Sequence, residues 1–246
     1  KPLHDKYIER WKEEFVRPLE RELTVTFDDY VDLPQGQLTL AITQNGWQGQ
    51  DEQPLGLLLL LDTKDKSSQL QTNLVALRRK WVDAGKAVRT ERIRGLEFTV
   101  LPMSSNDIPK TLRKFFPPQP EVQELGVEPE ARKTPPPSEL VIGQAESLLI
   151  VGNSVAVAEK VVSRMTGGSV PMLSDVAAYQ ANHLALFREA PLYGWVNTKT
   201  FLDIWARKAT KKENPEAPNP FDPPVQKIAA ATGLLGLKTL AFDIQN

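Results

Sequence analysis

The chain has 246 residues, of which 41% are hydrophobic, and its 30 basic and 31 acidic side chains leave a formal net charge of -1. This composition predicts a globular protein with a sizeable core, and it excludes a global electric field that would attract nucleic acid or anionic lipid. Because the chain contains no cysteine, disulfides, thiol nucleophiles and cysteine-ligated metals are also excluded.

Helices are expected over the first 34 residues. Apolar residues recur at helical spacing over 3–16, and Pro18 both ends that helix and opens a shorter one. Thr26 and Asp29 have the spacing of a capping box, which predicts a further short helix at this point.

Two apolar strands are expected next. Residues 37–44 alternate large apolar with smaller residues, which predicts a strand with one face against the core, the face of Leu38, Leu40 and Ile42. The unbroken apolar run 57–61 predicts a central strand that is covered on both faces. Because the single loop 45–54 joins the two strands, we expect them to be antiparallel neighbours.

A helix and a hairpin are expected after these strands. Residues 70–81 carry three leucines and a tryptophan at helical spacing, and the polar residues 65–68 offer side-chain oxygens that could cap this helix. Gly85 follows the last periodic residue, where a left-handed cap favours glycine. Residues 87–101 then predict a hairpin that turns at Arg94-Gly95.

The composition changes between residues 102 and 137, which hold nine of the 20 prolines. This stretch predicts an extended excursion with little regular structure. Beyond it, apolar runs and glycines predict further hairpins and helices up to a last strand near 237–244. We therefore expect an α+β fold with a mainly antiparallel, twisted sheet of about eight strands covered by helices. The chain is either one domain over 1–246 or a fragment of a larger chain, and two similar lobes, 1–101 and 138–246, remain an alternative.

The sharpest candidate for catalysis is the sequence Gly-Asn-Ser-Val-Ala at 152–156. It lies between an expected strand and an expected helix, as a G-x-S-x-G nucleophile elbow must. Ser154 would be the nucleophile and His183 its base. However, Ala156 replaces the last glycine, and the order of residues differs from that of α/β-hydrolases. The simpler interpretation is that Asn153 or Ser154 caps the helix.

Other kinds of site find little support in the sequence. The two histidines stand apart and no phosphate-binding glycine motif occurs, so no metal and no cofactor are expected. Residues 78–94 hold seven basic and two acidic side chains, but without interleaved aromatic residues, and no nucleic acid partner is expected. No segment is long and apolar enough to span a membrane. Trp47 lies in a turn region and is a candidate contact residue for a partner.

Four stretches carry a resemblance: GQLTLAI, LGLLLLLD, LVIGQAESLLIVGNSVAVAEKVV and YGWVN. In their order and hydrophobic rhythm they resemble secreted or envelope-anchored bacterial proteins built from a domain of unknown function. The resemblance implies export from the cytoplasm, to the periplasm or the outside of the cell, and brings no catalytic residues with it. Since the chain begins with Lys1 and ends in an apolar strand, we expect the natural protein to continue beyond both ends.

These patterns favour a non-enzymatic extracytoplasmic module that binds a protein or envelope partner, or supports an assembly. A serine hydrolase that uses Ser154 with His183 is one alternative, and a binder of small ligands or glycans in a cleft between two lobes is another. The hydrolase requires the Ser154 hydroxyl and the His183 imidazole within hydrogen-bond reach, whereas capping requires a side-chain oxygen that faces a backbone N–H of the next turn.

Overall fold

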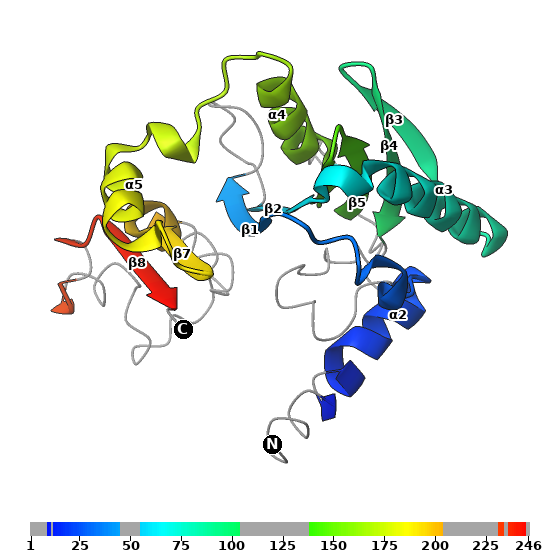
Figure 1. Cartoon of the computed structure of the whole chain (residues 1–246), viewed down its shortest axis with the longest axis horizontal. Helices are drawn as coiled ribbons and strands as arrows, with labels where there is room; N and C mark the ends of the chain where they lie inside the picture. The colour runs from blue at the N-terminus through cyan, green and yellow to red at the C-terminus, as the bar shows by residue number, and fades with distance from the viewer. Residues whose placement is uncertain are drawn as a thin grey trace, which may run out of the picture. The chain divides into compact units, whose positions relative to one another are not determined.

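The structure is a computed structural model that describes residues 9–10, 12–44, 55–103, 138–203, 231–233 and 236–244. The chain divides into two compact units, Lys1–Ser169 and Val170–Asn246. Figure 1 shows the elements of both units. Trp47 and most of the proline-rich stretch 102–137 lie outside the described residues.

An antiparallel sheet of six strands forms the centre of the first unit, in the order β1-β2-β6-β5-β4-β3 (Figure 1). Its strands are β1 (Leu38–Gln44), β2 (Leu55–Asp62), β3 (Arg89–Ile93), β4 (Leu96–Met103), β5 (Ser138–Ala145) and β6 (Leu148–Gly152). The predicted antiparallel sheet and the pairing of the first two strands are confirmed. The prediction of about eight strands in one sheet is wrong, because two of the strands pair separately in the second unit.

Strands from both sides of the proline-rich stretch belong to the same sheet. β4 pairs with β5 from Phe98 opposite Gly143 to Met103 opposite Ser138, although residues 104–137 separate them in the chain. The expected lobes 1–101 and 138–246 therefore do not coincide with the two units, whose boundary follows Ser169.

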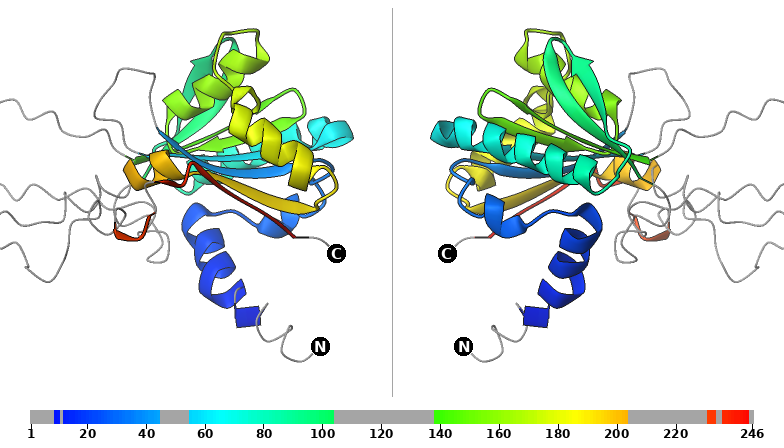
Figure 2. Two further views of the ribbon diagram at one scale, coloured as in Figure 1. Left: turned by 90° about the vertical axis from the view of Figure 1, so that its left-hand side faces the viewer. Right: turned by 90° about the vertical axis from the view of Figure 1, so that its right-hand side faces the viewer.

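Two helices cover opposite faces of the sheet, α3 (Ser67–Asp83) and α4 (Val155–Met165) (Figure 2). Alternation along β4 explains this arrangement, since successive side chains of a strand point to opposite faces. Phe98 and Val100 pack in the cluster that contains Val162 of α4, whereas Leu101 packs with Trp81 of α3. The predicted helical stripe of residues 70–81 is therefore part of the core.

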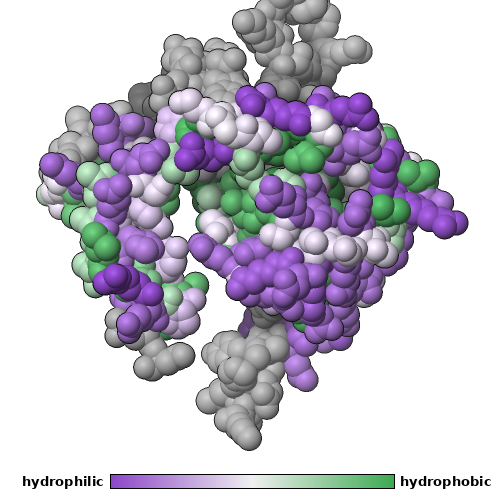
Figure 3. Space-filling view, turned by 45° about the horizontal axis from the view of Figure 1, so that its top comes forward, coloured by the Kyte–Doolittle hydropathy of each residue, from purple (hydrophilic) through white to green (hydrophobic). Residues whose placement is uncertain are grey.

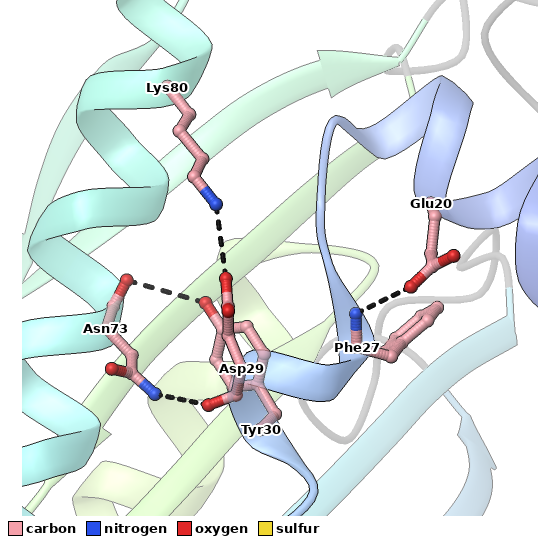
Figure 4. Close-up of polar contacts among 6 residues, drawn as sticks. All are labelled: Glu20, Phe27, Asp29, Tyr30, Asn73 and Lys80. Atoms are coloured by element: carbon pink, nitrogen blue, oxygen red, sulfur yellow. Dashed lines mark hydrogen bonds and ion pairs between the residues drawn. The ribbon is translucent and has the colours of Figure 1, made fainter.

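Two predicted caps are not formed. The Thr26 side chain makes no cap hydrogen bond to the 3-10 turn η2 (Phe27–Tyr30), and the Asp29 carboxylate contacts Lys80 of α3 instead of the Thr26 N–H. The Phe27 N–H donates to Glu20 of α2 (Arg17–Leu23) at 2.8 Å (Figure 4). The α3 N-terminus also lacks a side-chain cap, because the 3-10 turn η3 (Lys64–Lys66) leads directly into the helix.

The glycine turns follow the prediction. Gly85 after α3 has a φ of 71°, and Arg94 and Gly95 between β3 and β4 have φ values of 49° and 87°. Two consecutive positive φ angles are typical of the type I′ turn that matches the twist of a hairpin. Pro18 stands in the first turn of α2, directly after the π-helical segment η1 (Lys12–Val16), as the sequence predicted.

The second unit contains a two-stranded sheet, β7 (Leu192–Asn197) with β8 (Thr239–Ile244), and the short helices α5 (Ala177–Asn182) and η6 (His183–Phe187). Before α5, the Asp175 carboxylate accepts a hydrogen bond from the Met172 N–H and closes a 3-10 turn, η5 (Leu173–Asp175). One face of the sheet carries Tyr193 and Trp195, which contact aromatic rings of these helices.

Candidate interaction surface

Asn153 and Ser154, the centre of the candidate nucleophile elbow, both bind backbone groups. The Asn153 Oδ1 accepts a hydrogen bond from the Leu57 N–H at 2.8 Å, and its Nδ2 donates to the Leu55 carbonyl at 2.6 Å. Its amide thereby continues the pairing of β2 with β6. The Ser154 Oγ accepts a hydrogen bond from the Val157 N–H at 3.4 Å at the start of α4, which confirms the capping interpretation.

His183 belongs to the second unit, whereas Ser154 belongs to the first. The His183 ring lies in an aromatic cluster, 5.8 Å from Tyr179, 6.3 Å from Phe187 and 6.4 Å from Tyr193 between ring centroids. Burial and a hydrogen bond with Tyr193 raise the pKa of Tyr179 to about 12. The ring contacts of His183 therefore explain its position by packing.

A polar clamp joins η2 to α3 (Figure 4). The Asn73 Nδ2 donates to the Asp29 carbonyl at 2.7 Å, and the Tyr30 hydroxyl donates to the Asn73 carbonyl at 3.4 Å. Lys80 pairs with the Asp29 carboxylate at 3.1 Å. Burial, together with the charge of Asp29, raises the pKa of Tyr30 to about 12, so the hydroxyl stays protonated as a donor. The cavity between these groups measures about 30 Å³, which suits a water molecule but no larger ligand.

The basic stretch 78–94 is partly neutralised by carboxylates that lie outside it. Arg89 pairs with Glu139 of β5 at 2.7 Å, and Arg92 pairs with Glu97 of β4 at 3.0 Å. The tertiary structure thus brings in carboxylates that were not included in the count of charges over residues 78–94. These ion pairs reduce the local excess of positive charge.

The large apolar side chains of β1 are more exposed than the sequence predicted. Leu38, Leu40 and Ile42 were expected to face the core, but they are 57%, 73% and 61% exposed. Thr39 and Ala41, which alternate with them, are both half-buried. The large apolar side chains of β1 are therefore left open, unlike those of an ordinary half-covered strand.

The extent of α3 explains this exposure. The pairing register places Leu38 opposite Leu61, so the apolar residues of β1 share the sheet face that α3 covers. α3 packs over the inner strands of that face, through Leu70 on Leu61 and Trp81 on Leu101. Beside the helix lies an apolar strip that we call the β1 surface, formed by Leu38, Leu40 and Ile42 with the half-buried Leu57 and Leu59.

Hydrophilic residues cover much of the molecular face drawn in Figure 3, and hydrophobic residues gather there in separate patches. Contiguous exposed apolar patches on a folded protein commonly mark interaction sites. The β1 surface is such a patch. The prediction that β2 is covered on both faces holds only in part, because Leu61 is buried but the leucines 57–60 are half-buried.

β1 is also an edge strand, and in the described part of the chain no strand pairs with its outer side. Its sequence, LTLAITQ, contains neither a charged residue nor a proline. The other edge strand of this sheet, β3, has the sequence RTERI and carries three charged side chains. Charged residues on an edge strand discourage further strand pairing, and of these two edges the β1 edge lacks this protection.

The start of β1 is held in a defined position by Asp62 at the end of β2. The Gly36 N–H donates to the Asp62 carbonyl at 2.9 Å, and the Asp62 N–H donates to the Gln37 carbonyl at 3.1 Å. A Cβ on Gly36 would lie 2.4 Å from the Asp62 carboxylate, so a larger residue would disturb this approach. Hydrogen bonds from the Lys64 N–H and the Ser147 hydroxyl lower the pKa of Asp62. The β1 surface is therefore preorganised.

Among the described residues, no three or more His, Asp or Glu side chains gather in a way that could hold a metal ion. Within the same ranges, none of the helices has the length and apolar character needed to cross a membrane. Comparisons with protein-family models, curated proteins and solved structures found no match.

Proposed function

We propose that this protein is a non-enzymatic binding module of the bacterial envelope, and that it holds an extended, uncharged segment of a partner protein on β1. The observation that carries the proposal is the combination on one strand of an edge that no described strand pairs with, no charge and three exposed apolar side chains. The location in the envelope is supported by the resemblance of the chain to exported bacterial proteins.

Addition of a strand to β1 would satisfy the backbone groups of its outer edge, and the alternation of side chains would supply selectivity. Residues of the added strand that lie on the face of Leu40 would extend the apolar strip beside it. A charged residue at these positions would lose hydration without meeting an opposite charge, since β1 carries none. The partner segment should therefore alternate uncharged apolar residues with small residues.

The structural roles of the two candidate catalytic residues support a non-enzymatic function. The Ser154 hydroxyl accepts a backbone N–H at the start of α4, and the His183 ring contacts three aromatic side chains. A serine nucleophile needs its base within hydrogen-bond reach, and a base needs a group that orients it. The contacts of both residues are explained without such a pair.

The test uses a fluorescently labelled peptide with the alternating sequence LTLAITQ, flanked by lysines for solubility, and a scrambled peptide of the same composition. Fluorescence anisotropy should show binding of the alternating peptide only. Leu40→Lys should weaken this binding at least about tenfold, because the charge would be partly desolvated in the complex. Val75→Lys is the matched control, since Val75 of α3 is 66% exposed and lies outside the β1 surface.

Circular dichroism should show that both lysine variants are folded, because each replaces an exposed side chain. Equal binding of the scrambled peptide would show that the interaction is unspecific apolar adsorption and would overturn the proposal. Unchanged binding by Leu40→Lys would overturn it as well, since the peptide would then bind elsewhere.

A further inference from the structure

The second unit contains a pocket of about 520 Å³ that is independent of the β1 surface. It lies between the start of α5, the end of β7, the helical residues 198–203 and the segment that leads into β8. Pockets for small organic ligands commonly measure about 300–1,000 Å³ and combine apolar walls with a few polar groups. This pocket has that size and that composition.

The apolar part of the pocket is built around Trp195 of β7. The Trp195 Nε1 donates to the Asn182 Oδ1 at 3.3 Å, and the indole meets the Tyr179 ring edge to face with centroids 5.7 Å apart. These two contacts hold the indole in one orientation. Val176, Ala178, Leu202 and Leu237 add apolar side chains to the lining. A fixed indole among aliphatic side chains is a suitable wall for a flat ring.

The polar part of the pocket has an excess of positive charge. Lys199 and Lys238 both line it, whereas Asp203 is the single acidic residue among the described lining residues. The backbone that carries the lysines is held in place, because the Thr198 N–H donates to the Lys238 carbonyl at 3.2 Å. The Asn197 side chain accepts the Thr200 N–H at 3.1 Å, which starts the helix that carries Lys199.

We propose that this pocket binds a small organic anion that contains a flat ring. The ring lies against the Trp195 indole, and the anionic group lies between Lys199 and Lys238. A neutral ring would use the apolar wall alone, and a small inorganic anion would meet the lysines alone. The combination of both features in one pocket selects a molecule that has both, such as an aromatic carboxylate.

The test is isothermal titration calorimetry of the whole chain with 2-naphthoate and with 2-naphthamide, which has the same ring system without the charge. 2-Naphthoate should bind more tightly than 2-naphthamide. The double variant Lys199→Met, Lys238→Met should reduce this preference about tenfold, to near equality of the two probes. Lys12→Met is the charge control, because Lys12 lies in η1 of the first unit and its removal should leave the preference unchanged.

Ala178→Trp is designed to fill the pocket without removal of the Trp195 contacts, and it should abolish the binding of both probes. Binding that survives Ala178→Trp in a variant with a native circular dichroism spectrum would place the probes elsewhere and overturn the proposal. Equal affinity of 2-naphthoate and 2-naphthamide for the unmodified chain would also overturn it, as would the absence of binding heat at millimolar concentrations.

Discussion

The ring of Phe98 lies over Gly143, its direct partner on the neighbouring strand. A Cβ built on Gly143 would lie 2.4 Å from the Cδ1 of Phe98, much closer than two carbon atoms can approach. Phe98 is only 1% exposed, so its ring is enclosed by the core beneath α4. The absence of a side chain at position 143 is what leaves room for this buried ring.

Gly143→Ala should therefore lower the free energy of unfolding by about 1–3 kcal/mol, the usual cost of an overpacked core. Urea unfolding followed by circular dichroism measures this change. Gly194→Ala is the matched control, since its Cβ would lie 2.2 Å from the Phe242 ring, but Phe242 is 49% exposed and can turn outward. If both variants lost the same free energy of unfolding, the burial of the facing aromatic ring would not determine the cost of the added methyl group.

Asn153→Ala should cost more stability than Ser154→Ala. The Asn153 amide makes two hydrogen bonds to the β2 backbone, whose loss should cost about 1–3 kcal/mol. Ser154 makes one cap hydrogen bond, whose loss should cost about 1 kcal/mol. Urea unfolding of both variants measures the difference. If Asn153→Ala were as stable as the unmodified chain, Asn153 would not link β2 to β6.

Asp62 should make the stability of the protein depend on pH in the acidic range. Its folded pKa is lowered from the ordinary 3.8 by hydrogen bonds from the Lys64 N–H and the Ser147 hydroxyl. The carboxylate therefore contributes stability above pH 3.8, and this contribution is lost as the pH falls through the lower folded pKa. Asp62→Asn should be less stable than the unmodified chain at neutral pH. This difference in the free energy of unfolding should become smaller as the solution is acidified below the folded pKa. Urea unfolding at neutral pH and at a pH below the folded pKa measures this difference in the free energy of unfolding. A difference that does not change with pH would contradict the prediction.

The protein should not react with a fluorophosphonate probe. Intact-mass spectrometry after incubation should show no adduct, because the Ser154 hydroxyl is engaged as a helix cap. Ser154→Ala and His183→Ala serve as controls for the origin of any adduct. Labelling that disappears in both variants would establish a serine hydrolase and refute the non-enzymatic proposal.

Local signals predicted the elements of the first unit well. The alternation of Leu96, Phe98 and Val100, and the Arg94-Gly95 turn, depend on residues that are neighbours in the chain, and the hairpin forms as expected. The caps predicted at Thr26 and at residues 65–68 did not form, the second because the 3-10 turn η3 leads directly into α3. Lys80, which lies far from Asp29 in the sequence, binds the carboxylate that was expected to complete the capping box.

The candidate site was harder to predict. The sequence shows that LTLAITQ lacks charged residues and proline, and this is the available signal for an unprotected edge strand. It does not show that the strand lies at an edge of the sheet. The pocket in the second unit could not be predicted either. Its lining residues come from segments between positions 176 and 239, and their proximity depends on the pairing of β7 with β8.

The sequence by itself determined where strands, helices and glycine turns lie, because periodicity, capping and positive φ angles are properties of consecutive residues. Only the tertiary structure decided how far each face of the sheet is covered. Leu38 and Leu61 have the same character and share one face of the sheet, yet α3 covers Leu61 and leaves Leu38 exposed. Burial depends on where a distant helix packs, and no local pattern in β1 encodes the reach of that helix.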